Sequence, residues 1–233
     1  MQLNTIIGDI AEQAVDAIIL SLFEKTDALG GETAAIDHRL QGAISSLLGG
    51  GDFSGKLRET SVLYPGDALP ARRVIVVGLG PAEDFALDCA RHATAAAAVR
   101  ARELGARSLA SILHGAGAGR IETSGAARAA AEGALLGLYS FEQYKSEPEQ
   151  KKVTSFTLVE WDEQKAEALR SGAREGEIIA ECACKARDLV SEPPNSRTPS
   201  FLVAHAEKLA ADHGMAVRAL SEADARELNM GAF

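Results

Sequence analysis

The sequence is poor in cysteine and in aromatic residues, and each shortage excludes a class of protein. Its 233 residues include three cysteines, too few to hold a chain of this length together as a disulfide framework. Cys182 and Cys184 are two residues apart and would point to different faces of a helix, so we expect reduced, partly buried thiols. Only 5% of the residues are aromatic although 46% are hydrophobic, so the core must consist mainly of Ala, Leu, Val and Ile. This composition is typical of a helix-rich α/β protein.

Positive charge and long apolar runs are also scarce. The chain has 24 Lys and Arg against 33 Asp and Glu, and this balance argues against a broad basic surface for nucleic acid or anionic lipid. The first twenty residues have no basic region, and acidic residues interrupt them before an apolar stretch becomes long enough for a signal peptide or a membrane span. We therefore expect a cytoplasmic protein without a membrane partner.

Short β-branched runs alternate with longer alanine-rich segments, which is the rhythm of strands and crossover helices. The expected strands are Leu3–Ile7, Ala17–Leu20, Ser61–Tyr64, Val74–Val77, Leu109–Leu113 and Val153–Val159. The expected helices are Thr33–Leu48, Phe85–Leu104 and Ser124–Phe141. Val74–Val77 is apolar on both pleat faces, so we place it centrally with helices on each side. Because no helix is needed between Ser61–Tyr64 and Val74, and the first two strands are only about a dozen residues apart, we predict a mixed sheet flanked by helices.

The pattern changes after Trp161. Asp162 is expected to cap a long helix that ends near Val190, since Pro193 and Pro194 cannot continue it. The sequence then starts a second α/β pattern. We therefore predict an α/β domain over 1–170, a linker helix and proline boundary over 171–194, and the unfinished start of a second domain over 195–233.

This last part begins with another helix signal. Thr198 is the expected N-cap, Pro199 stands at the first helical position, and Gly214 would end the helix. A short strand, Ala216–Leu220, should follow, and then a helix that is capped at Ser221 and runs to about Leu228.

Two glycine-rich segments are candidates for ligand binding. Gly78 and Gly80 stand where a strand runs into a helix, as in a phosphate-cradling loop, but the third glycine of a dinucleotide fingerprint is missing. A tight turn is the simpler interpretation. The run Gly49–Gly51 either lets the backbone approach a ligand or forms a flexible hairpin, and we favour the hairpin.

No group of residues has the spacing of a catalytic or metal site. His205 and His213 lie eight residues apart on one expected helix, but no third ligand is near them in the sequence. The histidines are His38, His92, His114, His205 and His213. The aromatic residues Tyr139, Phe141 and Tyr144, beside Lys145, are interpreted as a helix end pinned to the core by its rings. We assign no catalytic, cofactor-binding or metal-binding residue to this chain.

Several motifs together resemble a known family. The run Ala186-Arg187-Asp188-Leu189-Val190-Ser191-Glu192-Pro193-Pro194-Asn195, followed by Thr198-Pro199, resembles the segment that leads into the catalytic domain of leucyl aminopeptidases, the cytosol aminopeptidases of peptidase family M17. Other segments are similar to the same family in the same order along the chain. They are Gly51–Lys56, Arg73–Gly80, Glu132–Phe141 with Tyr144-Lys145, and Leu228–Phe233.

The resemblance implies an amino-terminal α/β domain related to the macro fold, followed by a domain in which two divalent metal ions, zinc or manganese, activate water against the first peptide bond. In this family the metal ligands and the catalytic lysine lie in a Val-Gly-Lys-Gly…Asp-Ser-Gly-Gly segment and an Asn-Thr-Asp-Ala-Glu-Gly-Arg-Leu segment. Neither occurs in this sequence, and the Gly55-Lys56 pair lacks the aspartate motif that should follow it.

We therefore expect the non-catalytic amino-terminal part of an aminopeptidase, inactive by itself and without a cofactor of its own. The resemblance implies that it serves packing, hexamer assembly and active-site access in an enzyme that acts on peptides with free N-termini. The alternative is a free-standing macro-like module that binds ADP-ribose or a related nucleotide, for which Gly78, Gly80 and the Gly49–Gly51 run are the direct support. Some members of the family also bind DNA, but in this acidic chain that would need a locally basic groove.

Overall fold

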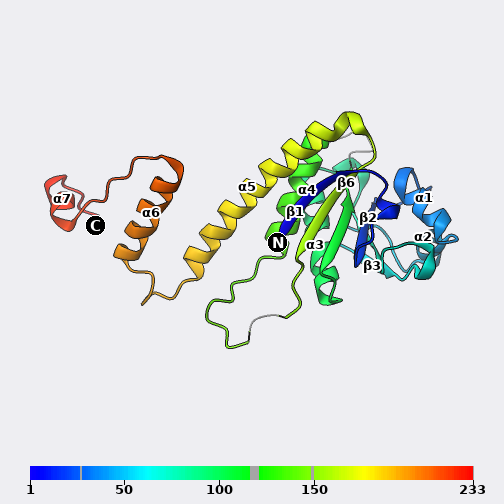
Figure 1. Ribbon diagram of the computed structural model, residues 1–233, viewed down its shortest axis with the longest axis horizontal. Helices are drawn as coiled ribbons and strands as arrows, with labels where there is room; N and C mark the ends of the chain where they lie inside the picture. The colour runs from blue at the N-terminus through cyan, green and yellow to red at the C-terminus, as the bar shows by residue number, and fades with distance from the viewer. Residues whose placement is uncertain (27, 116–120, 148–149, 233) are drawn as a thin grey trace. The chain divides into compact units, whose positions relative to one another are not determined.

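The computed structural model describes residues 1–26, 28–115, 121–147 and 150–232, and it divides into two compact units, Met1–Lys185 and Ala186–Phe233 (Figure 1). The division falls inside the predicted linker segment 171–194. It also falls inside one long helix, so helical backbone continues from the first unit into the second.

The first unit is built on a six-stranded sheet in the order β1-β6-β5-β2-β4-β3. All neighbouring strands are parallel except β3, which runs antiparallel to β4, so the predicted mixed sheet is confirmed. The strands are β1 (Gln2–Ile7), β2 (Ala17–Leu22), β3 (Thr60–Leu63), β4 (Val74–Gly78), β5 (Ser108–Ile112) and β6 (Ser155–Glu160).

Strand β4 is buried on both faces, as its continuous apolar run predicts. Ile75 and Val77 belong to one core cluster together with α3 and α4, whereas Val74 and Val76 belong to the other cluster with α1 and α2 (Figure 1). The strand is not in the middle of the sheet, however, since it lies next to the edge strand β3. Burial on both faces needs only one neighbour on each side and a helix layer above and below.

The helices of the first unit form the two outer layers. They are α1 (Gly31–Arg39), α2 (Ala43–Gly50), α3 (Leu87–Glu103), α4 (Thr123–Gly137) and the part of α5 (Ala166–Ser191) that ends at Lys185. The alanine-rich stretches 93–98 of α3 and 126–131 of α4 explain how a core with few aromatic residues is filled, because small side chains let the two helices approach closely. A Cβ atom on Gly133 of α4 would lie 2.3 Å from the carbonyl oxygen of Arg91 in α3.

The prediction of one helix over Thr33–Leu48 is wrong, because α1 and α2 are separate. Gln41 and Gly42 have left-handed backbone, with φ of 54° and 83°, and such residues cannot continue a right-handed helix. The buried Asp37 carboxylate starts the second helix by accepting hydrogen bonds from the N–H groups of Ile44 at 2.7 Å and Ser45 at 3.2 Å.

Two further local predictions are corrected. The run Gly49–Gly51 is no hairpin, since Gly49 and Gly50 end α2 and Gly51 caps it with φ of 77°. The rings of Phe141 and Tyr144 do not pin a helix end to the core. Helix α4 ends at Gly137, the two rings lie 5.9 Å apart beyond it, and Tyr144 is 55% exposed.

The capping predictions in the later part of the chain are confirmed. Asp162 accepts a hydrogen bond from the Gln164 N–H at 3.0 Å in a short 3-10 turn that leads into α5. In the second unit, the hydroxyl of Thr198 accepts from the N–H of Phe201 at the start of α6 (Pro199–His213), and Gly214 ends that helix with φ of 66°. Ser221 starts α7 (Glu222–Glu227) with a capping box.

The predicted strand Ala216–Leu220 is wrong, because the structure has no regular element over these residues and all of them are exposed. A strand is stable only when it pairs with a neighbour and covers one face. No strand pairing in the described part of the second unit provides either.

Candidate functional site

A cavity of about 350 Å³ lies at the carboxyl ends of β2, β5 and β6 and at the start of α1. Parallel α/β sheets usually bind ligands at this end, because the loops after the strands converge there. Its walls include apolar residues such as Leu22, Ile112 and Val159. Its polar groups include Glu32, Glu160 and Lys165. We call this cavity the strand-end pocket.

The strand-end pocket is acidic. Glu160 is 5% exposed, accepts a hydrogen bond from the Asp162 N–H at 3.2 Å, and has the Lys165 ammonium 3.8 Å away. Burial first, and then the charges of Glu160 and Asp9, raise the pKa of Glu32 from 4.5 to about 7, while Lys165 acts in the opposite direction. The Lys165 ammonium lies 3.8 Å from Asp162 as well, so one cation faces the three carboxylates of Glu32, Glu160 and Asp162. This balance of charge opposes the binding of a diphosphate.

Gly78 and Gly80 do not form an open phosphate cradle. The Gly78 N–H donates to the Glu59 carbonyl at 2.8 Å, and the Gly80 N–H donates to the Gly55 carbonyl at 2.9 Å. A Cβ atom on Gly78 would lie 2.0 Å from the Lys56 carbonyl oxygen. The loop that precedes β3 therefore occupies the position in which a phosphate would meet these amides, and the close packing of this loop explains both glycines.

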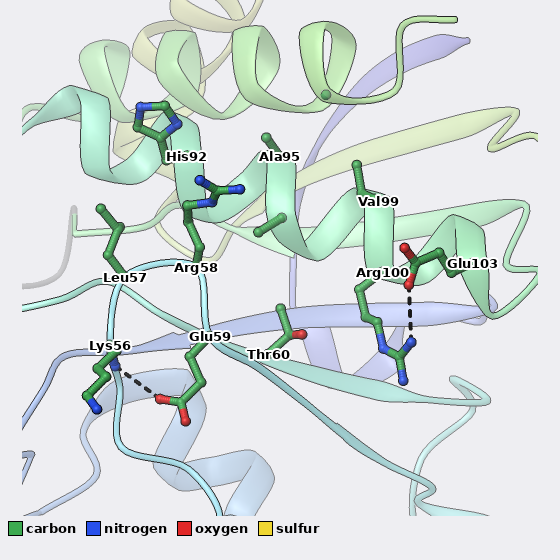
Figure 2. A pocket seen from close by; sticks show the side chains of 12 residues that line it. Lys56, Leu57, Arg58, Glu59, Thr60, His92, Ala95, Val99, Arg100 and Glu103 are labelled. Atoms are coloured by element: carbon green, nitrogen blue, oxygen red, sulfur yellow. Dashed lines mark hydrogen bonds and ion pairs between the residues drawn. The ribbon is translucent and has the colours of Figure 1, made fainter.

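A second hollow, of about 910 Å³, lies between the edge strand β3 and helix α3 (Figure 2). We call it the β3–α3 groove. Figure 2 shows Leu57, Arg58 and Thr60 on the side of the strand and Ala95 and Val99 on the helix. Its lining residues are Lys56, Leu57, Arg58, Glu59, Thr60, His92, Ala95, Ala96, Val99, Arg100, Glu103 and Gly137.

The carboxylates and cations of the β3–α3 groove differ in their partners. Glu59 accepts hydrogen bonds from the Ser54 hydroxyl at 2.8 Å and the Lys56 N–H at 3.1 Å, and Glu103 pairs with Arg100 at 3.1 Å. Burial alone would raise the pKa of Glu59, but the hydrogen bonds outweigh it and lower the pKa. Within the described chain, the side chains of Lys56, Arg58 and His92 have no hydrogen-bond or ion-pair partner. The dashed line at Lys56 in Figure 2 starts from its backbone N–H.

The histidines and cysteines do not gather into a site. His114 is completely buried, neither ring nitrogen has a hydrogen-bond partner among the described residues, and burial lowers its pKa to about 4. His205 stacks on Phe201 with 6.5 Å between ring centroids, and His213 is exposed. Within residues 1–26, 28–115, 121–147 and 150–232, no three His, Cys, Asp or Glu side chains come together as metal ligands. None of the three cysteines forms a disulfide; Cys182 is exposed, and Cys89 and Cys184 are partly buried.

Sequence reasoning did not bring the residues of either hollow together. Glu32 and Glu160 are far apart in the chain, and only the position of Glu160 at the end of an apolar run hints at a strand-end site. Lys56 was considered only as part of a Gly-Lys pair.

Among the helices that the structure describes, none is both long and apolar enough to cross a bilayer.

Comparison with known proteins extends these observations. The model of the Cytosol aminopeptidase family, N-terminal domain, matches residues 10–148. The probable cytosol aminopeptidase of Roseiflexus castenholzii is 36% identical over 236 residues, which are 100% of this chain and 45% of the relative. That of Thermosynechococcus vestitus is 33% identical over 239 residues, 100% of this chain and 46% of the relative. The chain thus spans about half the length of the curated relatives it matches.

Solved structures agree with the fold. The bottromycin maturation enzyme BotP in complex with Mn is 26% identical, with a TM-score of 0.65 over 86% of this chain and 37% of its own. A tomato leucine aminopeptidase mutant is 22% identical, with a TM-score of 0.81 over 98% of this chain and 46% of its own. A Trypanosoma brucei macrodomain in complex with ADP is 17% identical, with a TM-score of 0.56 over 73% of this chain and 68% of its own.

The last two likenesses show the fold alone, a mixed macro-like α/β sheet flanked by helices, as predicted. The family match adds a sequence relationship that covers more than half of the 233 residues. Together with the motifs found along the chain, it shows that the protein belongs to the cytosol aminopeptidase family and carries the N-terminal domain of that family.

Proposed function

We propose that this chain is the non-catalytic amino-terminal part of a leucyl aminopeptidase that removes N-terminal residues from peptides in the cytoplasm. The observation that carries the proposal is the match of residues 10–148 to the family's N-terminal domain, in a chain that spans about half the length of its relatives. The absence of the family's two metal-binding segments from the sequence supports the same proposal. In this scheme 1–170 is the N-terminal domain, 171–194 the linker, and 195–233 the beginning of the catalytic domain.

Two divalent ions, zinc or manganese, would activate water in the parent enzyme. The manganese bound to the related BotP supports this choice of chemistry. The described residues of this chain do not fit such a centre, because they bring no three suitable ligands together. We therefore assign both ions to the parent's catalytic domain and derive no catalytic step from the residues of this chain.

In the parent, the role that we infer for the chain is packing, hexamer assembly and control of access to the active site. Support comes from the second unit, in which many large apolar side chains are exposed. They include Phe201, Leu202, Leu209, Met215, Val217, Leu220 and Leu228. A surface of this kind is normally covered by another domain or subunit.

The test is the release of p-nitroaniline from leucine p-nitroanilide by the purified chain, with added manganese or zinc. We expect no turnover above the background of metal alone, because the chain lacks the ligands that would bind and orient the ions. A full-length relative serves as the positive control. Turnover that copurifies with the chain and is abolished by a chelator would contradict the proposal.

A further inference from the structure

We propose that the outer edge of β3 and the β3–α3 groove bind an acidic peptide in an extended conformation, which adds to the sheet as a further strand. This site is separate from the proposed peptidase chemistry and does not depend on it. The backbone edge, the space in the groove and the unpaired cations each support the proposal.

The first support is the backbone edge. Strand β3 ends the sheet and, among the strands that the structure describes, pairs with β4 alone, in the register Ser61 opposite Val76. The Gly78 N–H donates to the Glu59 carbonyl, so the backbone groups of Glu59, just before β3, point toward β4. Because successive residues of a strand direct their N–H and C=O groups to opposite sides, those of Thr60 and Val62 lie on the outer edge. A peptide strand can form backbone hydrogen bonds with these groups.

The second support is the space beside that edge. Thr60 and Val62 are on the face of the sheet that packs toward α3, since their partners Val77 and Ile75 belong to the core cluster under this helix. At the groove, α3 presents the small side chains of Ala95 and Ala96. They leave the hollow of about 910 Å³. Alternate side chains of an added strand would point into this space.

The third support is charge. Lys56, Arg58 and His92 have no partners in the described structure, whereas Glu59 and Glu103 are already bound to groups of the chain itself. Lys56 and Arg58 are unpaired cations in a protein with a net charge of -9, a value that counts histidine as neutral. Lys and Arg favour carboxylates by charge-assisted hydrogen bonds. An open backbone edge beside these cations favours a peptide over a nucleic acid, because a nucleic acid would leave the edge unpaired.

The experiment measures fluorescence anisotropy with the complete 233-residue chain. The probe is a fluorescein-labelled peptide of alternating valine and glutamate, and lysine replaces glutamate in the control peptide. We expect the acidic probe to bind at least ten times more tightly than the control. A third peptide, N-methylated at every second residue so that one edge cannot donate hydrogen bonds, should bind at least ten times more weakly than the unmodified probe.

Variants of the chain test the same site from the protein side. Val62→Pro removes one outward N–H at an edge strand, where proline is tolerated, and should weaken binding of the acidic probe at least tenfold. Lys56→Gln combined with Arg58→Asn should weaken it about fivefold to tenfold, since Asn tolerates the left-handed backbone of position 58. Lys185→Gln, an exposed lysine on α5, is the matched control and should change nothing.

If Val62→Pro does not fold, the N-methylated peptide still tests the backbone edge. Equal binding of the acidic and lysine peptides, or indifference to N-methylation, would overturn the proposal. A concentration-dependent dimer, detected by light scattering and abolished by Val62→Pro, would also overturn it, because it would assign the edge to a second copy of this chain.

Discussion

Gly78 has no room for a side chain, because the loop before β3 packs against its backbone. A Cβ atom would lie 2.0 Å from the Lys56 carbonyl oxygen and 2.6 Å from the Gly55 carbonyl. Both obstacles are backbone, which cannot rotate away. We expect Gly78→Ala to lower the free energy of unfolding by about 3 kcal/mol or more, measured by urea denaturation.

The control for Gly78 is Gly49→Ala in α2. Apart from the chain neighbours and the backbone of its own helix, no atom of the described structure lies within 4 Å of the added methyl group, and alanine is the better helix former. This variant should be neutral or more stable by up to about 1 kcal/mol. If the two variants behave alike, close packing is not the reason for glycine at position 78.

The raised pKa of Glu32 makes stability depend on pH. Burial, and after it the charge of Glu160, moves this pKa from 4.5 to about 7. Between these values the folded chain binds more protons than the unfolded chain, so this group's contribution to stability falls as the pH rises. Glu32→Gln removes the free-energy cost of ionising this carboxyl group in the folded chain. We expect the variant to be more stable than the unsubstituted chain at pH 8 by roughly 1–2 kcal/mol, after discounting for partial exposure. Near pH 4.5 the two should have similar stability.

Urea denaturation at pH 4.5, 6 and 8 measures this effect, with Glu12→Gln as a control at an exposed carboxylate. His114 acts in the opposite direction between pH 4 and 6.5, because its buried ring stays neutral in the folded chain while the unfolded chain takes up a proton. The contribution of Glu32 is therefore isolated by the difference in the free energy of unfolding between the unsubstituted chain and the variant. A constant difference at all three pH values would contradict the assignment.

At the scale of elements, one buried carboxylate connects three helices. The Glu132 side chain in α4 is 7% exposed and pairs with Arg91 of α3 and, at 3.7 Å, with Arg128, which also binds Glu175 of α5 at 3.0 Å. Glu132→Ala would leave the half-buried Arg91 guanidinium without this partner. We expect a loss of about 2–4 kcal/mol in the free energy of unfolding.

The matched control is Glu167→Ala, which removes an ion pair with Arg170 on the exposed face of α5, where the Glu167 side chain is 84% exposed. It should cost less than about 1 kcal/mol. Thermal unfolding followed by circular dichroism measures both variants. Losses of equal size would show that burial of Glu132 is not what makes its ion pairs matter.

The elements themselves could be predicted largely from local pattern, and the failures have identifiable causes. Apolar runs located all strands of the sheet to within a few residues. The break between α1 and α2 was missed because Gln41 adopts left-handed backbone and the cap is Asp37, several residues before the second helix. The strand Ala216–Leu220 failed for another reason, since strand formation depends on a partner.

At the scale of the whole molecule, we expect segment 195–233 to be the least stable part. Apart from Ala210, the residues of its helices are not buried, and large side chains such as Leu202 and Leu228 are exposed. Each large side chain left in water forfeits about 1.5–3 kcal/mol. Amide hydrogen exchange should therefore be faster here than in Val74–Val77 at low protein concentration.

Exchange measured at several concentrations distinguishes fraying from self-association. Protection that rises with concentration would show that another copy covers the segment. Protection equal to that of β4 in a strict monomer would contradict the prediction and the domain boundary on which it rests.

The sequence by itself determined the α/β class, the mixed sheet, the helix caps at Thr198 and Ser221, and the family resemblance. The fold class, the sheet type and the caps follow from residue periodicity and turn chemistry, which act over a few neighbours. The family resemblance follows instead from the motifs and their order along the chain. Only the tertiary structure decided the strand order, the electrostatic proximity of Glu32 and Glu160, and the packing of the Lys56 backbone against Gly78. Such pairings depend on which distant segments become neighbours, and burial then sets the energy of their charges and the space around their atoms.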